Sequence, residues 1–75
     1  MKKQKAQYNR IKGALADAVV ANKELAEGIG VTESTVSLWC TNAKQPSIET
    51  LFLIAEFLKM DARELLVANN HARLR

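Results

Sequence analysis

The chain has 75 residues, of which 48% are apolar and only four are aromatic, a composition typical of one small helical domain. A domain of this size buries only about 60% of the surface of its unfolded chain, so it depends on close helix packing, a cross-link, a metal or a partner subunit. Cys40 is the single cysteine and His71 the single histidine. An intrachain disulfide and a metal site of three or four Cys and His ligands are therefore excluded, and the cysteine content fits a reducing cytoplasm.

The net charge of +3 comes from eleven Lys and Arg residues against eight Asp and Glu residues, and it is unevenly distributed. The first twelve residues carry five basic side chains and no acidic one, while Arg73 and Arg75 add two at the other end, so the segment between them is net acidic. Positive charge is typical of proteins that bind nucleic acid. Here it belongs to the two ends of the chain rather than to the expected folded body.

The basic start is followed by the apolar stretch GALADAVVA, a combination that also occurs in secretory signals. Asp17 interrupts this stretch, and Ile11, Leu15 and Val19 are spaced as on one face of a helix, which favours a folded segment. No apolar run reaches the roughly 20 residues of a membrane span. We expect a cytoplasmic protein without a membrane segment.

Residues 1–7 lack an apolar pattern and are predicted to form a mobile basic arm. Residues 8–19 follow the i, i+3, i+4, i+7 rule and predict a first helix. Asn22 can cap a second helix, which Gly30 ends by supplying a left-handed residue. Gly28, inside this helix, is expected to cost about 1 kcal/mol relative to alanine.

Thr32 is a good N-cap for a third helix that runs to about Asn42. Ser47 caps a fourth, and Asp61 with Glu64 forms a capping box that begins a fifth. No segment alternates with period two, so no strand is predicted. The predicted buried side chains are those of Tyr8, Ile11, Leu15, Ala18, Val19, Leu25, Ala26, Ile29, Val31, Val36, Trp39, Leu51, Ile54, Ala55, Leu58, Leu65 and Leu66, with Cys40 as an inert, half-buried filler.

Residues 22–42 combine a short helix, a glycine-containing turn and a second helix with a threonine cap, which is the layout of a DNA-binding helix-turn-helix. In that arrangement Ala26 is small so that the helices cross closely, and Gly30 permits the turn. Val31 and Val36 then fill the space between the helices. The same layout also fits an ordinary pair of antiparallel helices, and spacing alone does not separate the two.

Three stretches carry a more specific pattern: ELAEGIGVTESTVSLW, the Pro46–Ser47 entry into the fourth helix, and IETLFLIAEFLKMDARELL. With them, residues 9–67 resemble the phage-repressor and Cro-like family of helix-turn-helix regulators, also called the xenobiotic-response-element type. The resemblance implies an all-α five-helix bundle of the lambda-repressor-like type over residues 8–68, followed by a tail of residues 69–75. It also implies a dimer on double-stranded DNA with helix 32–42 in the major groove.

The outer face of helix 32–42 holds the residues expected to contact base edges, because the early residues of a recognition helix reach into the groove. Glu33 can accept a hydrogen bond from the amino group of cytosine, and Thr35 or Leu38 can contact a thymine methyl group. No Arg, Asn or Gln precedes Asn42 on this face, and many relatives carry Arg where Leu38 stands. The expected base-contacting residues are Glu33, Ser34, Thr35, Ser37 and Leu38.

Contacts to the DNA backbone are expected around this helix and at the helix starts, because residues 22–42 carry one lysine against three glutamates. Where relatives have a phosphate-contacting Gln, this chain has Asn22, which can make the same kind of hydrogen bond. The preceding cap, Thr or Ser in relatives, is Ala21. The expected phosphate-contacting residues are Arg10, Lys12, Asn22, Lys23, Thr32, Asn42 and Lys44.

The basic arm has two interpretations. Charged ends keep a small protein soluble, and basic arms also follow phosphates or enter the minor groove of DNA. On the second interpretation, deletion of residues 2–7 flattens the salt dependence of DNA binding.

The fourth helix is more apolar than one buried face requires, because Phe52, Leu53 and Phe57 remain after its core positions are assigned. One or more of these side chains can pack under the fifth helix. The alternative is a dimer interface at Leu53 and Phe57.

The sequence offers no nucleophile with a suitably spaced base, no glycine-rich phosphate loop and no cluster of metal ligands, so an enzyme is not expected. No cofactor and no ligand-sensing domain are expected, and regulation would depend on protein concentration, competition or a protein partner. We interpret the chain as a sequence-specific regulator that binds a two-fold operator as a homodimer. The alternative is an interaction module of antitoxin or adaptor type with little DNA affinity; RNA binding is less favoured because an aromatic stacking platform is missing.

Overall fold

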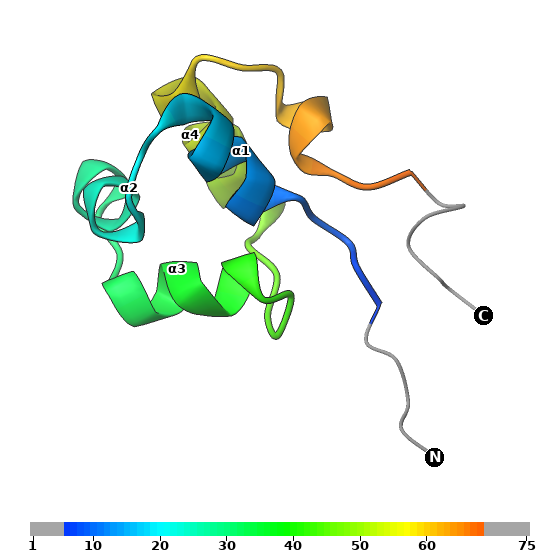
Figure 1. The fold of residues 1–75 in the computed structure, drawn as a ribbon, viewed down its shortest axis with the longest axis horizontal. Helices are drawn as coiled ribbons and strands as arrows, with labels where there is room; N and C mark the ends of the chain where they lie inside the picture. The colour runs from blue at the N-terminus through cyan, green and yellow to red at the C-terminus, as the bar shows by residue number, and fades with distance from the viewer. Residues whose placement is uncertain (1–5, 69–75) are drawn as a thin grey trace.

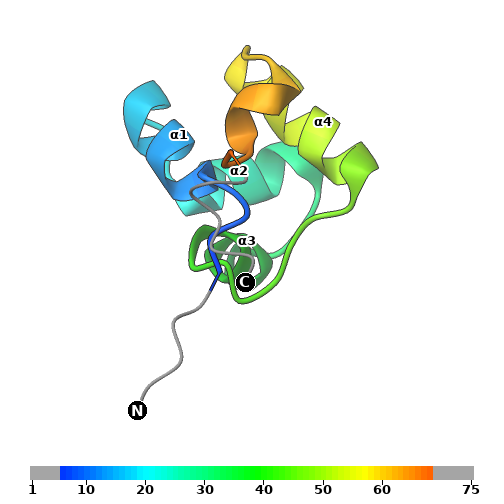
Figure 2. The ribbon, with the colours of Figure 1, turned by 90° about the vertical axis from the view of Figure 1, so that its right-hand side faces the viewer.

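The computed structural model describes residues 6–68, which form four α-helices and one 3₁₀ turn. The elements are α1 (Ile11–Ala18), α2 (Asn22–Ile29), α3 (Glu33–Cys40), α4 (Ile48–Leu58) and the turn η1 (Ala62–Leu65). Helix α3 lies along one edge of the molecule, with the other helices all on one side of it (Figures 1 and 2). The described residues hold no strand, and an isolated antiparallel bridge joins Asn9 to Leu66.

The core is built from one face of each helix, as the apolar spacing predicts. Trp39 of α3 and Leu51 and Ile54 of α4 are buried together with residues of α1, α2 and η1. Tyr8, Ala18, Val19 and Leu66 were expected in the core, but they are exposed. The buried apolar residues are Ile11, Ala14, Leu15, Leu25, Ala26, Val36, Trp39, Leu51, Ile54, Ala55, Ala62 and Leu65.

Helix α1 begins three residues later than predicted because Tyr8 and Asn9 are engaged elsewhere. The Asn9 side-chain oxygen accepts a hydrogen bond from the Ile11 N–H at 2.9 Å and so caps the first turn. On the other side the Tyr8 carbonyl accepts from the Val67 N–H at 3.0 Å, which holds this segment extended. The helix ends at Val19, whose left-handed backbone (φ 57°) turns an 87% exposed side chain into solvent.

Helices α2, α3 and α4 lie close to the predicted boundaries, because their signals are local. The predicted cap of α2 is wrong, since Ala21 takes the cap position and Asn22 is the first helical residue. Gly30 ends α2 with φ 81° and donates its N–H to the Ala26 carbonyl at 2.9 Å. Thr32 caps α3 by accepting from the Thr35 N–H at 3.2 Å. Ser47 caps α4 by accepting from the Thr50 N–H at 3.1 Å.

The predicted fifth helix is a single 3₁₀ turn, and its capping box is not formed. The Asp61 carboxylate accepts instead from the Arg63 N–H at 2.9 Å. The chain cannot continue as a helix beyond Leu65, because the Leu65 carbonyl accepts from the Arg10 N–H at 2.9 Å and Leu66 pairs with Asn9. Pairing with the N-terminal segment replaces the last helix.

Candidate DNA-binding surface

The outer face of α3 presents a row of exposed side chains opposite the buried Val36 and Trp39. This row consists of Glu33, Ser34, Ser37, Leu38 and Thr41. Four of the five residues expected to contact bases therefore share one exposed face. The fifth, Thr35, lies half-buried at its margin, and Thr41 is an addition that the sequence pattern did not single out.

Three hydroxyl groups cluster at the start of α3. The Thr32 hydroxyl lies 3.2 Å from that of Ser34 and 2.8 Å from that of Thr35. Each hydroxyl can donate one hydrogen bond and accept others. The cluster therefore offers both donors and acceptors to a base edge or a phosphate, without a fixed charge.

The start of α2 and Lys12 lie beside the C-terminal part of α3. The Cys40 thiol donates to the Asn22 side-chain oxygen at 3.7 Å, and the positive charge of Lys12 acts on the same thiol. This arrangement leaves the Asn22 amide nitrogen as a donor near the exposed face of α3. Two expected phosphate contacts, Lys12 and Asn22, thus lie near the C-terminal part of α3, and Lys23 is exposed at the start of α2.

No side chain caps the first turn of α2 in the part of the chain that the structure describes. Ala21 adopts the extended backbone of an N-cap residue but has no acceptor, and its own N–H donates to the Glu24 carboxylate at 2.8 Å. The amides that open a helix bind anions well when no side chain occupies them. A DNA phosphate could take the place that Thr or Ser would fill.

Burial raises the pKa of the Cys40 thiol, and the nearby Lys12 charge offsets this only in part. The thiolate, which is the reactive form, is therefore disfavoured at neutral pH. This agrees with the expectation of an inert, half-buried filler.

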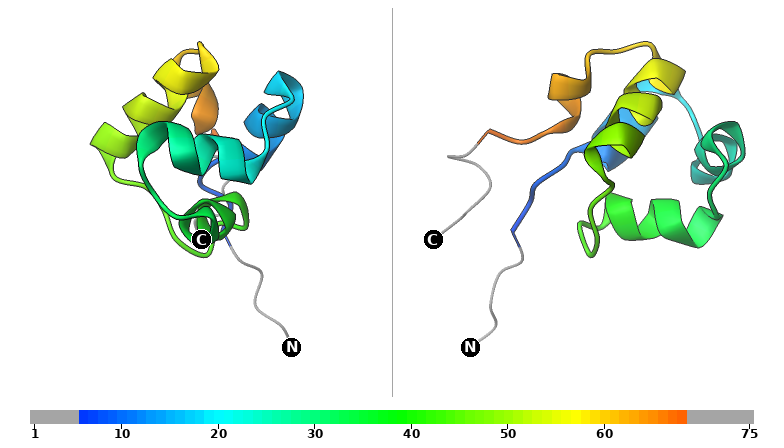
Figure 3. Two further views of the ribbon diagram at one scale, coloured as in Figure 1. Left: turned by 90° about the vertical axis from the view of Figure 1, so that its left-hand side faces the viewer. Right: turned by 180° about the vertical axis from the view of Figure 1, so that it is seen from behind.

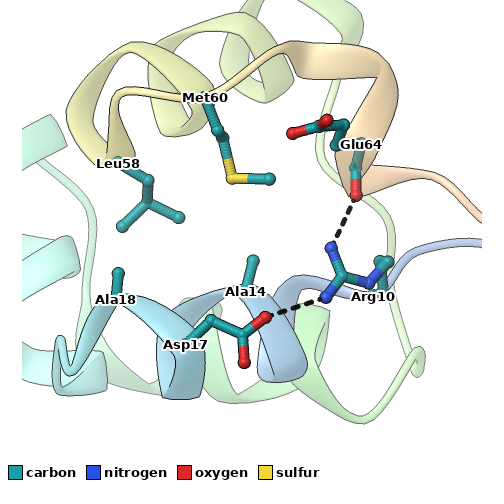
Figure 4. A pocket seen from close by; sticks show the side chains of 7 residues that line it. All are labelled: Arg10, Ala14, Asp17, Ala18, Leu58, Met60 and Glu64. Atoms are coloured by element: carbon teal, nitrogen blue, oxygen red, sulfur yellow. Dashed lines mark hydrogen bonds and ion pairs between the residues drawn. The ribbon is translucent and has the colours of Figure 1, made fainter.

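Arg10 does not point at the recognition helix. Its guanidinium donates to the Glu64 carbonyl at 2.9 Å and pairs with Asp17 at 3.2 Å, at the rim of a hollow of about 300 Å³ between α1, the end of α4 and η1 (Figure 4). The floor of this hollow is apolar, with Leu58 and Met60 on one side. Because these partners hold Arg10 on the far side of α1, we exclude it from the proposed phosphate contacts.

Asn42 was expected to reach a phosphate, but its side chain is 7% exposed and is engaged inside the protein. Its oxygen accepts from the N–H groups of Tyr8 and Asn9 at 2.9 and 3.0 Å. Its nitrogen donates to the Asn9 carbonyl at 3.1 Å. We therefore remove Asn42 from the proposed contacts, while Lys44 stays exposed in the loop that follows it.

The amide cluster of Asn9, Asn42 and Gln45 is a feature that the sequence pattern did not reveal. Asn42 ends α3 in a left-handed conformation (φ 62°), which Asn tolerates better than most residues, so a local signal for its turn position was present. No local signal pairs it with Asn9, because the two residues are 33 positions apart.

The exposed apolar residues of α4 fall on two flanks. Phe57 (39% exposed) lies on the flank toward α2 and Phe52 on the flank toward η1, while Leu53 (48% exposed) lines the hollow on each flank. Phe52 and Leu53 line a hollow together with Ala62 of η1, as the alternative of packing against the last turn allows, whereas Phe57 packs elsewhere. Its ring lies against Gly28 of α2, where a Cβ atom would collide with it.

The electrostatic balance of residues 6–68 is acidic, with six basic and eight acidic side chains and a net charge of −2. The remaining five basic residues lie in segments 1–5 and 69–75, outside the described residues. Within residues 6–68 no group of His, Cys, Asp and Glu could hold a metal ion. No helix there has the length and apolar character to span a bilayer.

The comparisons with known proteins agree with this geometry. Residues 21–65 match the model of a helix-turn-helix family. A solved structure from Bacteroides fragilis, described as that of a "putative DNA-binding protein", is 46% identical, covers 79% of this chain and 95% of its own, and superposes with a TM-score of 0.78. No curated protein matches. With the turn at Gly30 and the exposed third helix in the expected places, the chain belongs to the helix-turn-helix family, of the phage-repressor and Cro type.

Proposed function

We propose that this helix-turn-helix protein acts in the cytoplasm as a sequence-specific regulator, which binds a two-fold operator as a homodimer and inserts α3 into the major groove. The observation that carries the proposal is the exposed row on α3, with the uncapped start of α2 beside it. In dimers of this kind the half-sites lie about one helical turn, or ~34 Å, apart.

The chemistry of the row limits what it can read. Glu33 suits the amino group of cytosine, Leu38 a thymine methyl group, and the hydroxyl groups of Ser34, Thr35 and Ser37 suit either kind of edge. Bidentate readers of guanine and adenine are missing from α3. Specificity would therefore combine several modest contacts with the shape of the operator.

Contacts to the DNA backbone would come from Lys12 in α1, Asn22 and Lys23 at the start of α2, Thr32 at the cap of α3 and Lys44 in the loop after α3. The net charge of −2 on residues 6–68 opposes binding, so the basic ends have to supply much of the attraction. The exposed row on α3 would thus recognise the DNA sequence, while the basic ends of the chain would supply much of the electrostatic attraction.

The decisive experiment is an electrophoretic mobility shift with the DNA upstream of the protein's own gene, at two salt concentrations. We expect sequence-selective binding that weakens steeply as salt increases. Absence of binding at both concentrations would favour the alternative, an interaction module of antitoxin or adaptor type. That alternative has one observation in its support, the acidic balance of α2 and α3.

The dimer surface is proposed on α4 around Leu53 and Phe57. We expect Leu53→Lys to yield a folded monomer that binds a palindromic site poorly, because a desolvated charge would have to enter the interface. Sedimentation velocity gives the oligomeric state. Ala16→Lys, on the exposed side of α1, is the matched control and should leave the dimer unchanged. A dimer that survives Leu53→Lys would place the interface elsewhere.

A further inference from the structure

The hollow between α1, the end of α4 and η1 has the size and lining of a site for a small ligand. Its volume is about 300 Å³, at the lower end of the range for ligand sites. Ala14 and Ala18 of α1 face Leu58 and Met60 across it (Figure 4). Leu58 and Met60 are only half-buried, so part of their apolar surface is exposed to water. An apolar group that filled the hollow would cover this surface and gain the free energy of its burial.

Three charged side chains complete the lining of the hollow: Arg10, Asp17 and Glu64. Figure 4 shows the Arg10 guanidinium between the Asp17 carboxylate and Glu64. The guanidinium has five N–H donors. One of them donates to the Glu64 carbonyl at 2.9 Å and another to the Asp17 carboxylate at 3.2 Å. Within the part of the chain that the structure describes, three donors therefore remain for a further acceptor.

Both carboxylates can also accept from a ligand. The side chains of Arg10 and Asp17 are 43% and 78% exposed, and an ion pair this exposed contributes little to stability. Asp17 can therefore accept from a second donor at small cost. The Glu64 carboxylate makes no hydrogen bond or ion pair within residues 6–68. The hollow thus combines one cation and two anions with an apolar floor.

We propose that this hollow binds a free apolar α-amino acid in its zwitterionic form. The ligand carboxylate accepts from the remaining N–H groups of Arg10, and the ligand ammonium group donates to the Asp17 or Glu64 carboxylate. The apolar side chain of the ligand lies on the floor against Leu58 and Met60.

The charges of the lining decide the class of ligand. A simple carboxylic acid would face two carboxylates, and a simple amine would face the guanidinium, whereas a zwitterion places an opposite charge beside each. The lining includes no residue of α3. The ligand therefore does not occupy the exposed row on α3, and the proposal is independent of DNA binding.

The test is a set of titrations of the full chain, followed by the backbone amide signals in two-dimensional NMR spectra. The probe is L-leucine, and two analogues each lack one of its charges: N-acetyl-L-leucine has no ammonium group, and L-leucinamide has no carboxylate. We expect L-leucine to bind with a Kd of about 1 mM and each analogue to bind about tenfold more weakly or worse. The shifted signals should include those of Ala14, Leu58 and Glu64.

Two results of these titrations would overturn the proposal. If either analogue bound as tightly as L-leucine, the hollow would not recognise a zwitterion. If L-leucine shifted no signal around the hollow at concentrations up to about 50 mM, the hollow would not be a site for this class of ligand.

Ala18→Leu tests the position of the site, because the larger side chain would fill the hollow that Ala18 lines. Ala16→Leu is the matched control, since Ala16 is exposed on the same helix and does not line the hollow. We expect Ala18→Leu to abolish the binding of L-leucine and Ala16→Leu to leave it unchanged. Both positions are exposed, so both variants should fold, and circular dichroism checks this. Binding that survives Ala18→Leu would overturn the proposed site.

Glu64→Gln and Asp17→Asn test the ammonium contact without changing the shape of the hollow. Their combination should weaken the binding of L-leucine about tenfold and leave that of N-acetyl-L-leucine unchanged or stronger, because only the first ligand carries an ammonium group. An equal effect on both ligands, or none on L-leucine, would contradict the proposed contact.

Discussion

Gly28 shows how one residue without a side chain sets the distance between two helices. On sequence alone it is only a weak point of α2, with a cost of about 1 kcal/mol relative to alanine. In the structure the ring of Phe57 from α4 lies where its Cβ would be. The same glycine that weakens the helix therefore permits its close approach to α4.

We expect Gly28→Ala to destabilise the protein by about 1 kcal/mol, because the cost of displacing the Phe57 ring exceeds the gain in helix propensity. In a Phe57→Ala background the ring is gone, and the same substitution should stabilise by up to about 1 kcal/mol. Urea denaturation of the four proteins measures both values. The same sign in both backgrounds would contradict the packing explanation.

The Asp61 carboxylate makes the stability of the protein depend on pH. Its hydrogen bonds with the side chain and the backbone N–H of Arg63 lower its pKa from 3.8 to about 2. A pKa that is lower in the folded state adds stability that is complete above the unfolded value and disappears as the pH falls through the folded value. We expect the Tm to fall between about pH 4 and pH 2 more steeply in the wild type than in Asp61→Asn. The difference should be small because the pair is exposed, and identical profiles would show that it contributes nothing.

The role of a single residue could be predicted where its cause is local in the sequence, and could not where the cause lies far along the chain. The burial of Trp39 and the left-handed Gly30 follow from spacing and residue type, and both were predicted. The role of Asn42 was not, because it depends on Asn9, whose position in the fold no short-range pattern specifies. Val19 was misassigned because the apolar spacing of α1 continues through a residue whose backbone has already turned away.

At the scale of elements, the two helices of the helix-turn-helix differ in how their first turns are capped. Thr32 caps α3 with its hydroxyl, whereas Ala21 takes the cap position of α2 with no acceptor. We expect Thr32→Ala to cost about 1 kcal/mol, Thr32→Ser to be nearly neutral, and Ala21→Ser to stabilise by about 0.5 to 1 kcal/mol. Thermal and urea denaturation provide the measurements. A neutral Ala21→Ser would mean that the serine hydroxyl does not accept from the N–H groups of the first turn of α2.

The two element predictions that were wrong concern the start of α1 and the last helix, and these two segments pair with each other in the structure. Helices α3 and α4 carry side-chain caps at their starts, α2 ends at Gly30, and the sequence placed all three helices closely. The start of α1 and the last turn depend on pairing between residues 8–10 and 65–67, which outweighs the local preference for helix in both. A pattern within a short stretch of sequence cannot predict pairing between two segments that are this far apart in the chain.

At the scale of the whole molecule, the charge is separated from the fold. Residues 6–68 hold the core, the row on α3 and the amide cluster, but they are net negative. On the proposed function, DNA binding by the exposed face of α3 would draw on basic residues outside residues 6–68. Figure 3 shows the position of α3 from two further sides. The sequence predicted the place of this face and of most of its residues, but not that Arg10 and Asn42 serve the protein's own structure.

We expect a fragment of residues 6–68 to unfold cooperatively with a Tm within a few degrees of the full chain, since it keeps the core as the structure describes it. Its DNA affinity should fall, and its salt slope should decrease by about 0.9 for each phosphate contact that the five removed basic residues make. Differential scanning calorimetry and fluorescence titration at several salt concentrations test the two expectations. If the fragment kept the salt slope of the full chain, the electrostatic attraction for DNA would come from residues 6–68.

The bridge between Asn9 and Leu66 also has a topological consequence. It places the two ends of the described chain side by side, so that residues 9–66 form a loop that lacks only a covalent closure. A short flexible linker could join the ends, and new termini could open at the exposed turn after α1. Such a circular permutant would keep α2, α3 and α4 in one uninterrupted stretch. It would also move the chain ends away from the paired segments 8–10 and 65–67, which Figure 1 shows on the side of the molecule opposite α2.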